Sequence, residues 1–213
     1  TFGVPVRYGF GFGLSYTEFA LSGCTVEKKQ NGILEILAKV KNTGDRSGKE
    51  VVEAYASLPE GKMEKEARRL IGFTKTAELK PQEEQIVKIQ VPWKNFASYN
   101  EIQSAWVLEE GEYGIELGNS LGTAQEYAAF RVTEEIVLEQ DRKICCMESG
   151  MKEVICENRN GRTKRQAEVP VIELQASEIE KVTVKYKKNT ELYPENAMEF
   201  VRTLTREECM KLA

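Results

Sequence analysis

Short apolar runs bounded by glycine, proline or asparagine recur from residue 18 to residue 132, and they constrain the fold more than any other feature. Within them apolar and polar residues alternate, as in Tyr113, Ile115 and Leu117, which places the apolar side chains on one face of a strand. β-Branched and aromatic residues are frequent, which favours strands over short helices. The pattern predicts an all-β fold, an antiparallel β-sandwich. The expected strands are residues 19–26, 33–40, 51–56, 69–76, 86–91, 106–108, 113–117 and 128–132.

The last third of the chain, residues 133–213, differs in composition, and we expect it to form a mixed C-terminal extension. Residues 132–138 are expected to prolong the preceding strand, and residues 169–174 to form a further one. The stretch 139–168 between them is polar and charged, which is typical of a loop. Residues 177–188 fit a helix and a strand equally well.

A capping box is expected near the end of the chain, because Thr205 is followed three residues later by Glu208. A helix should therefore begin at Thr205. The chain starts at Thr1 without a methionine or signal peptide and stops within this expected helix. We therefore expect it to be a piece of a longer protein.

The absence of histidine is the strongest exclusion in the composition. It removes Ser-His-Asp and Cys-His catalysis, and it removes the commonest metal ligand. The formal net charge of −4 provides no basic footprint, so no nucleic-acid partner is expected. No stretch approaches the roughly 18 consecutive apolar residues of a membrane-spanning helix, so no membrane partner is expected either.

The cysteines do not have the spacing of a disulfide framework, because they are odd in number and irregularly placed. They are Cys24, Cys145, Cys146, Cys156 and Cys209. The last four could in principle hold zinc, but adjacent Cys145 and Cys146 lack the preferred C-x-x-C spacing. We expect no metal and no cofactor. Reduced thiols and the lack of an N-x-[ST] sequon favour a bacterial cytoplasmic protein over a secreted one.

Residues 1–16 are rich in aromatic residues and glycine, and we expect a loop because Gly9, Gly11 and Gly13 leave nothing to pack on one face. A phosphate-binding loop would need a strand before it and a helix after it, whereas here a strand follows. We expect instead a strap that packs against a neighbouring domain. The side chains expected to make this interdomain contact are Tyr8, Phe10, Phe12 and Tyr16.

Two tryptophans could stack on sugar rings, but core packing is the competing explanation for both. Trp106 lies within an expected strand, and Trp93 ends one, so Trp93 is the residue kept as a possible sugar contact. Acidic residues near turns are expected to be solvated charges. These are Glu109, Glu110, Glu134 and Glu135.

Five segments resemble, in the same order, the C-terminal third of family 3 glycoside hydrolases such as bacterial β-glucosidases. Residues 10–17, FGFGLSYT, are similar to the family's FGYGLSYT signature. The other similar segments are 40–52 (VKNTGDRSGKEVV), 69–73 (RLIGF), 111–115 (GEYGI) and 117–120 (LGNS). The resemblance covers roughly residues 8–132. It implies an immunoglobulin/fibronectin type III-like β-sandwich.

The resemblance also implies a domain organisation. Residues 1–17 would be a strap leading from a preceding α/β domain, residues 18–132 the sandwich, and residues 133–213 an extension toward a catalytic barrel outside this chain. In the usual family pattern the protein ends soon after the sandwich. The segment 198–208, MEFVRTLTREE, resembles the helix that opens the barrel, which suggests a member with a permuted domain order.

The resemblance implies no catalytic residues within this chain. The family's nucleophile is an Asp in a Ser-Asp-Trp context, which the sequence lacks, and its general acid lies in the α/β domain. Hydrolysis needs both carboxyl groups on opposite sides of the scissile bond. We therefore expect a structural accessory domain of a β-glucosidase-like enzyme, whose partners are catalytic domains of the same parent chain. The alternatives are a carbohydrate-binding module and a protein-interaction sandwich.

Overall fold

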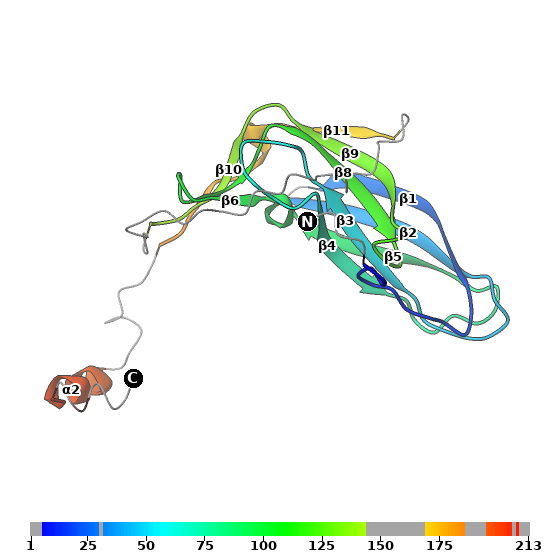
Figure 1. The fold of residues 1–213 in the computed structure, drawn as a ribbon, viewed down its shortest axis with the longest axis horizontal. Coiled ribbons are helices and arrows are strands. Elements are labelled where there is room, and N and C mark those ends of the chain that lie inside the picture. Colours follow the sequence, from blue (N-terminus) through cyan, green and yellow to red (C-terminus); the bar gives the residue numbers. More distant parts are fainter. Residues whose placement is uncertain (1–5, 30–31, 144–168, 186–194, 206–207, 209–213) are drawn as a thin grey trace. The chain divides into compact units, whose positions relative to one another are not determined.

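The computed structural model describes residues 6–29, 32–143, 169–185, 195–205 and 208. These fall into two compact units, residues 1–182 and residues 183–213, which are described separately. The first unit is a β-sandwich, as the alternation of apolar residues predicts (Figure 1). The second contains the helix α2, Glu195–Thr203.

The sandwich is built from three sheets (Figure 1). One has the order β1-β2-β5, with strands Phe19–Lys29, Ile33–Asn42 and Glu84–Pro92. A second has the order β11-β9-β8-β3-β4, with strands Val171–Leu174, Gln125–Val132, Gly111–Gly118, Val51–Ser57 and Arg68–Lys75. The third has the order β12-β10-β7-β6, with strands Val182–Thr183, Ile136–Gln140, Ala105–Leu108 and Ser98–Asn100.

The eight strands expected before residue 133 are confirmed, and two features differ from expectation. The short strand β6 was not predicted; it follows a 3₁₀ turn, η1, at Trp93–Phe96. The expected continuation through residues 132–138 is wrong, because the chain bends at residues 133–134 and β10 pairs with β7 in another sheet. A strand within residues 169–174 is confirmed as β11, which pairs in parallel with β9. Within the ambiguous stretch 177–188, the described residues 177–185 include the end of the short 3₁₀ turn η2, Ala176–Glu178, and the strand β12, while residues 186–188 lie outside the described residues.

The core is apolar and has an aromatic centre around Phe130, which is fully buried. The ring of Tyr113 stacks on it with centroids 4.6 Å apart. Trp93 and Phe96 meet it edge-on at 5.1 Å and 4.9 Å, the arrangement that ring quadrupoles favour. The Tyr113 hydroxyl donates to the Glu109 carbonyl at 3.1 Å, so this buried polar group is satisfied.

A β-bulge in β4 decides which side chains reach the outer surface. Ala54 pairs with Gly72 and Tyr55 with Leu70, so Ile71 is an extra residue in β4. Its carbonyl accepts a 2.8 Å hydrogen bond from the Asn95 side chain in η1. Simple alternation from buried Ile71 would place Phe73 inside, but the bulge moves Phe73 to the outer face, where it is 69% exposed.

Candidate functional site: an aromatic strap on the sandwich

The strap, residues 6–17, is a loop as predicted, and hydrogen bonds hold it at two points. At one point the Leu121 amide donates to the Phe10 carbonyl at 2.9 Å. At the other the Thr17 hydroxyl donates to Asn42 Oδ1 at 2.8 Å. Asn42 is fully buried, and its amide group also donates to the Leu79 carbonyl at 2.9 Å. The predicted turn after Asn42 is therefore tied to the end of the strap.

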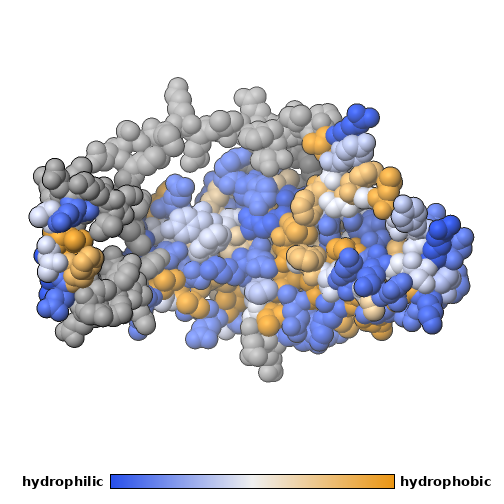
Figure 2. All heavy atoms as spheres, turned by 90° about the horizontal axis from the view of Figure 1, so that it is seen from below, coloured by the Kyte–Doolittle hydropathy of each residue, from blue (hydrophilic) through white to orange (hydrophobic). Residues whose placement is uncertain are grey.

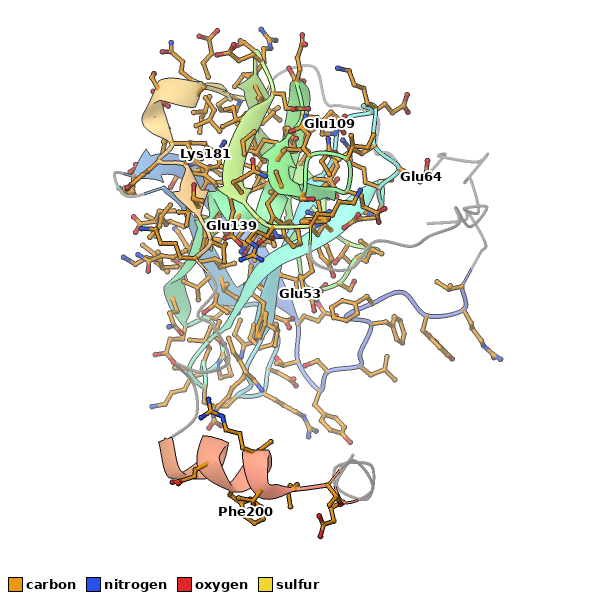
Figure 3. All side chains as sticks on the ribbon, turned by 90° about the vertical axis from the view of Figure 1, so that its left-hand side faces the viewer. Glu53, Glu64, Glu109, Glu139, Lys181 and Phe200 are labelled. Atoms are coloured by element: carbon orange, nitrogen blue, oxygen red, sulfur yellow. The ribbon has the colours of Figure 1, made fainter. Side chains whose placement is uncertain are left out.

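Gly11 brings the strap backbone against a buried carboxylate. It has a positive φ of 76°, and a Cβ at this position would overlap with the carboxylate of Glu53 in β3. Only glycine satisfies both requirements without strain. Glu53 points away from the core, so the strap crosses the outer face of the five-stranded sheet (Figure 3).

Replacing Gly11 with alanine is expected to loosen the strap from the sheet by about 1–3 kcal/mol, because the substitution adds backbone strain and a steric overlap. Hydrogen exchange should reveal this as faster exchange of the Leu121 amide, which is bonded to Phe10. Gly13→Ala is the matched control, since Gly13 has no neighbour within 4 Å of an added Cβ. Equal exchange in both variants would contradict the contact.

A polar cluster lies on the outer sheet face near this crossing point. The Tyr55 hydroxyl donates to Glu53, and Arg68 forms an ion pair with the buried carboxylate of Glu116. Arg68 also donates to the Leu121 carbonyl at 3.1 Å and lies 5.7 Å from the centre of the Tyr55 ring. Burial first and the hydrogen bond to Glu53 second raise the pKa of Tyr55, so its phenol stays a neutral donor. These contacts suit a structural support rather than acid–base chemistry.

The four aromatic side chains expected to contact another domain are exposed on the strap. Tyr8, Phe10, Phe12 and Tyr16 are 55–91% exposed, and the rings of Tyr8 and Phe12 lie 4.7 Å apart. Phe73 is a further exposed aromatic, and it lies directly across from Glu53 on the same sheet face. Figure 2 shows apolar areas interspersed with hydrophilic ones on the face in view. Apolar patches of this kind are typical of interaction sites.

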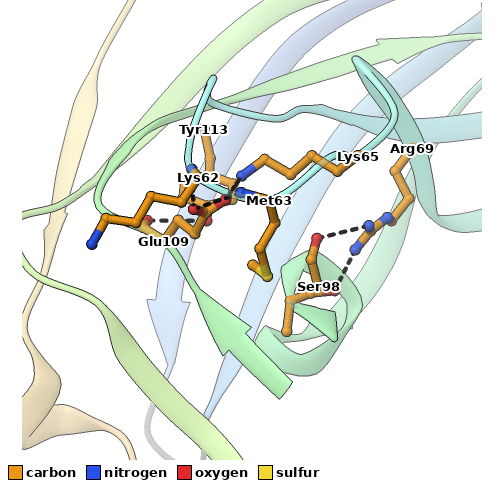
Figure 4. A network of polar contacts seen from close by, with 8 residues as sticks. Lys62, Met63, Lys65, Arg69, Ser98, Glu109 and Tyr113 are labelled. Carbon is orange, nitrogen blue, oxygen red and sulfur yellow. Dashed lines mark hydrogen bonds and ion pairs between the residues drawn. The ribbon is translucent and has the colours of Figure 1, made fainter. Parts of the chain in front are cut away.

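A second loop, residues 58–67, is fixed on the sandwich by Glu109 (Figure 4). This carboxylate accepts hydrogen bonds from the backbone amides of Lys62 and Met63 and pairs with the Lys65 ammonium. A Cβ on Gly61 would overlap with it. Burial alone would raise the pKa of Glu109, but the bonds from Lys65 and the Lys62 amide outweigh this, and the pKa lies below its usual value.

The expectation that Glu109 is a solvated charge is therefore wrong. Its side chain is 5% exposed, because the 58–67 loop folds over it. The other three carboxylates in that expectation, Glu110, Glu134 and Glu135, are exposed. The sequence signal that was missed is Gly61 together with Lys65, a glycine and a cation in the loop that covers the carboxylate.

The two tryptophans occupy different environments. Trp93 is 4% exposed and packs against Phe130 and Phe96, so a sugar ring has no access to its faces. Its burial supports core packing, the alternative left open by the sequence, over a stacked sugar. Trp106 is partly buried and meets Tyr99 edge-on at 5.5 Å. The Lys94 ammonium lies 5.5 Å from the centre of the Trp106 ring.

The thiols provide no reactive or metal-binding group within the described residues. Cys24 is half-buried, and burial raises the pKa of its thiol to about 11, so it stays protonated. Cys145, Cys146, Cys156 and Cys209, the residues of the possible zinc site, lie outside the described residues. In the part of the chain that the structure describes, no cluster of three metal-ligating side chains occurs. No helix among these residues is long and apolar enough to span a membrane.

Comparison with known proteins agrees with the β-sandwich. Residues 50–121 match the family model of the fibronectin type III-like domain. The chain is 44% identical over 140 residues to a β-glucosidase from Ruminococcus albus and 36% identical over 155 residues to β-glucosidase A from Butyrivibrio fibrisolvens. These alignments cover 63% of this chain but only 15% and 19% of the two enzymes.

A solved structure shows the same relationship. The crystal structure of a β-glucosidase from Paenibacillus barengoltzii superposes with a TM-score of 0.59 at 36% identity. The superposition covers 63% of this chain and 16% of that enzyme. The chain thus spans less than a fifth of the length of the relatives it matches.

Proposed function

Because this chain contains a fibronectin type III-like domain of the kind found in family 3 β-glucosidases, we propose that it is a non-catalytic structural part of a β-glucosidase-like glycoside hydrolase. Its role would be to brace the catalytic domains of the same parent chain. One observation carries this proposal: the strap holds aromatic side chains outward while its backbone is fixed to the sheet.

The fixed backbone supports docking because little conformational freedom remains to be lost when a partner binds. The strap is anchored at Phe10, Gly11 and Thr17, yet the rings between and beside these anchors are exposed. Each large apolar side chain contributes about 1.5–3 kcal/mol if it becomes fully buried. The outer face of the β1-β2-β5 sheet is different, because ion pairs such as Lys88–Glu35 at 3.0 Å and Lys39–Glu84 at 3.3 Å cover it. A face with charged side chains of this kind is better suited to contact with water than to docking against another domain.

We propose further that the second unit leads toward the next domain of the parent. Thr205 and Glu208 form the expected capping box: the Thr205 amide donates to the Glu208 carboxylate at 2.8 Å, and the Glu208 amide donates to the Thr205 hydroxyl at 3.4 Å. A helix start at this position is compatible with the permuted domain order that the resemblance implies.

In the parent enzyme, Phe10→Ala is expected to weaken interdomain docking by up to about 1.5–3 kcal/mol, seen as a lower unfolding temperature and reduced hydrolysis of an aryl β-glucoside. In the 213-residue chain alone the same substitution should change stability by less than about 0.5 kcal/mol, because the ring is already exposed. The control is Ile86→Ala, an equally exposed residue on the opposite outer face. An unchanged parent enzyme would refute the docking role, and hydrolysis by the chain alone would refute its non-catalytic nature.

A further inference from the structure

A cleft of about 560 Å³ opens beside η1, away from the strap. This volume lies in the range of about 300–1,000 Å³ that is typical of small-molecule sites. Its walls include the apolar side chains of Pro92, Leu138, Ile179 and Val182. Figure 3 labels two residues on the segments that border it: Glu139 on β10, and Lys181, which directly precedes β12.

Trp93 forms part of the cleft and carries an unused hydrogen-bond donor. The residue is 96% buried, and its indole N–H has no hydrogen-bond partner within the described part of the chain. The indole edge faces Gly32, where an added Cβ would lie 3.7 Å from Trp93 Cδ1. Gly32 and Trp93 both line the cleft, so this edge of the indole ring, which carries the N–H, lies beside it.

The polar groups around the cleft are paired with one another but retain bonding capacity. The Lys94 ammonium donates to Glu139 at 2.6 Å, and Lys28 pairs with Glu178 at 2.6 Å. An ammonium has three donors and a carboxylate about four acceptor positions, so Lys94 and Glu139 can each bind a further hydroxyl. Lys28 already donates to the Glu173 carbonyl and to both carboxylate oxygens of Glu178. The lining contains the carboxylates of Glu139, Glu178 and Glu180 against a single ammonium, which disfavours an anionic ligand.

We propose that this cleft binds a neutral saccharide. A sugar hydroxyl would accept the Trp93 N–H and others would bond to Lys94 and Glu139, while the C–H faces of the ring would lie on the apolar walls. Trp93 then contacts the sugar through its edge, and not by stacking. The site is independent of the strap and adds a binding role to the proposed structural one.

Nuclear magnetic resonance of the ¹⁵N-labelled 213-residue chain tests the proposal directly, because its two tryptophans give two indole N–H signals. Trp106→Phe assigns them. Titration with cellotetraose should move the Trp93 signal in a saturable way, with a dissociation constant of about 0.1–10 mM. Tetragalacturonate, which carries carboxylates, should bind at least about tenfold more weakly.

Two variants separate binding from folding. Glu139→Gln, at a partly exposed position, should lower the affinity for cellotetraose about tenfold, and Trp93→Phe about threefold to tenfold. Glu84→Gln, on the outer face of the β1-β2-β5 sheet, is the matched control and should bind normally. A stationary Trp93 signal at saturating cellotetraose would overturn the proposal, as would unchanged affinity in Glu139→Gln. Neither result bears on the strap, which is tested in the parent enzyme.

Discussion

Replacing Glu109 with alanine is expected to destabilise the chain by about 3–5 kcal/mol, because it leaves a buried ammonium without its partner. The Lys65 side chain is 5% exposed, and the ionised carboxylate of Glu109 forms an ion pair with its ammonium. The variant would also remove the acceptor for the backbone amides of Lys62 and Met63. Urea denaturation followed by tryptophan fluorescence measures the loss, and limited proteolysis should show new cleavage in the 58–67 loop.

The control for this prediction removes both charges. Lys65→Met combined with Glu109→Leu should recover much of the lost stability, since a pair of apolar side chains can replace a buried ion pair at little cost. If the double variant is no more stable than Glu109→Ala, the unpaired buried ammonium is not the cause of the lost stability. The pH dependence provides a second check.

The sign of the pH effect follows from the lowered pKa of Glu109 in the folded state. A carboxyl group with a lowered folded pKa contributes stability that is complete above its unfolded pKa, about 4.3, and is lost as the pH falls through the folded pKa. The stability difference between the wild type and Glu109→Gln should therefore shrink below about pH 4.

Regular alternation made most of the fold predictable. The strand from Ile33 to Asn42 buries every second residue, and the sequence pattern alone locates it. Alternation fails where the backbone departs from regular pairing. The bulge at Ile71 reverses the faces of β4 and exposes Phe73, and the Ile71 carbonyl accepts a hydrogen bond from distant Asn95. No local pattern contains that information.

The strap could be predicted in part, because glycine at alternate positions excludes a packed strand and leaves the aromatic rings outward. What the sequence could not supply was the position of the strap on the sheet. Gly11 lies on Glu53, as Gly61 lies on Glu109, so two loops each cross a buried carboxylate at a glycine. These pairs are separated by about forty residues or more in the chain, and only the tertiary structure brings them together.

The two contacts also suggest why buried charge is tolerated in this sandwich. Each carboxylate accepts bonds from a group beside it, Tyr55 for Glu53 and Lys65 for Glu109, and the glycine lets the backbone close over the site. Apolar replacements could stabilise the fold equally well. We infer that these carboxylates are suited to holding the loops in one geometry, which a surface for docking requires.

Phe130→Ala is expected to cost about 3–5 kcal/mol, the usual range for truncating a fully buried aromatic residue. The loss combines transfer free energy with a cavity at the centre of the core, where three rings meet Phe130. Trp93 is one of them, so its fluorescence should shift to longer wavelength as water gains access. Phe73→Ala, which removes a 69% exposed ring, should change the free energy of unfolding by less than about 0.5 kcal/mol. If the two variants were equally stable, Phe130 would not be the centre of the core, and the fixed position of the Trp93 N–H would lose its support.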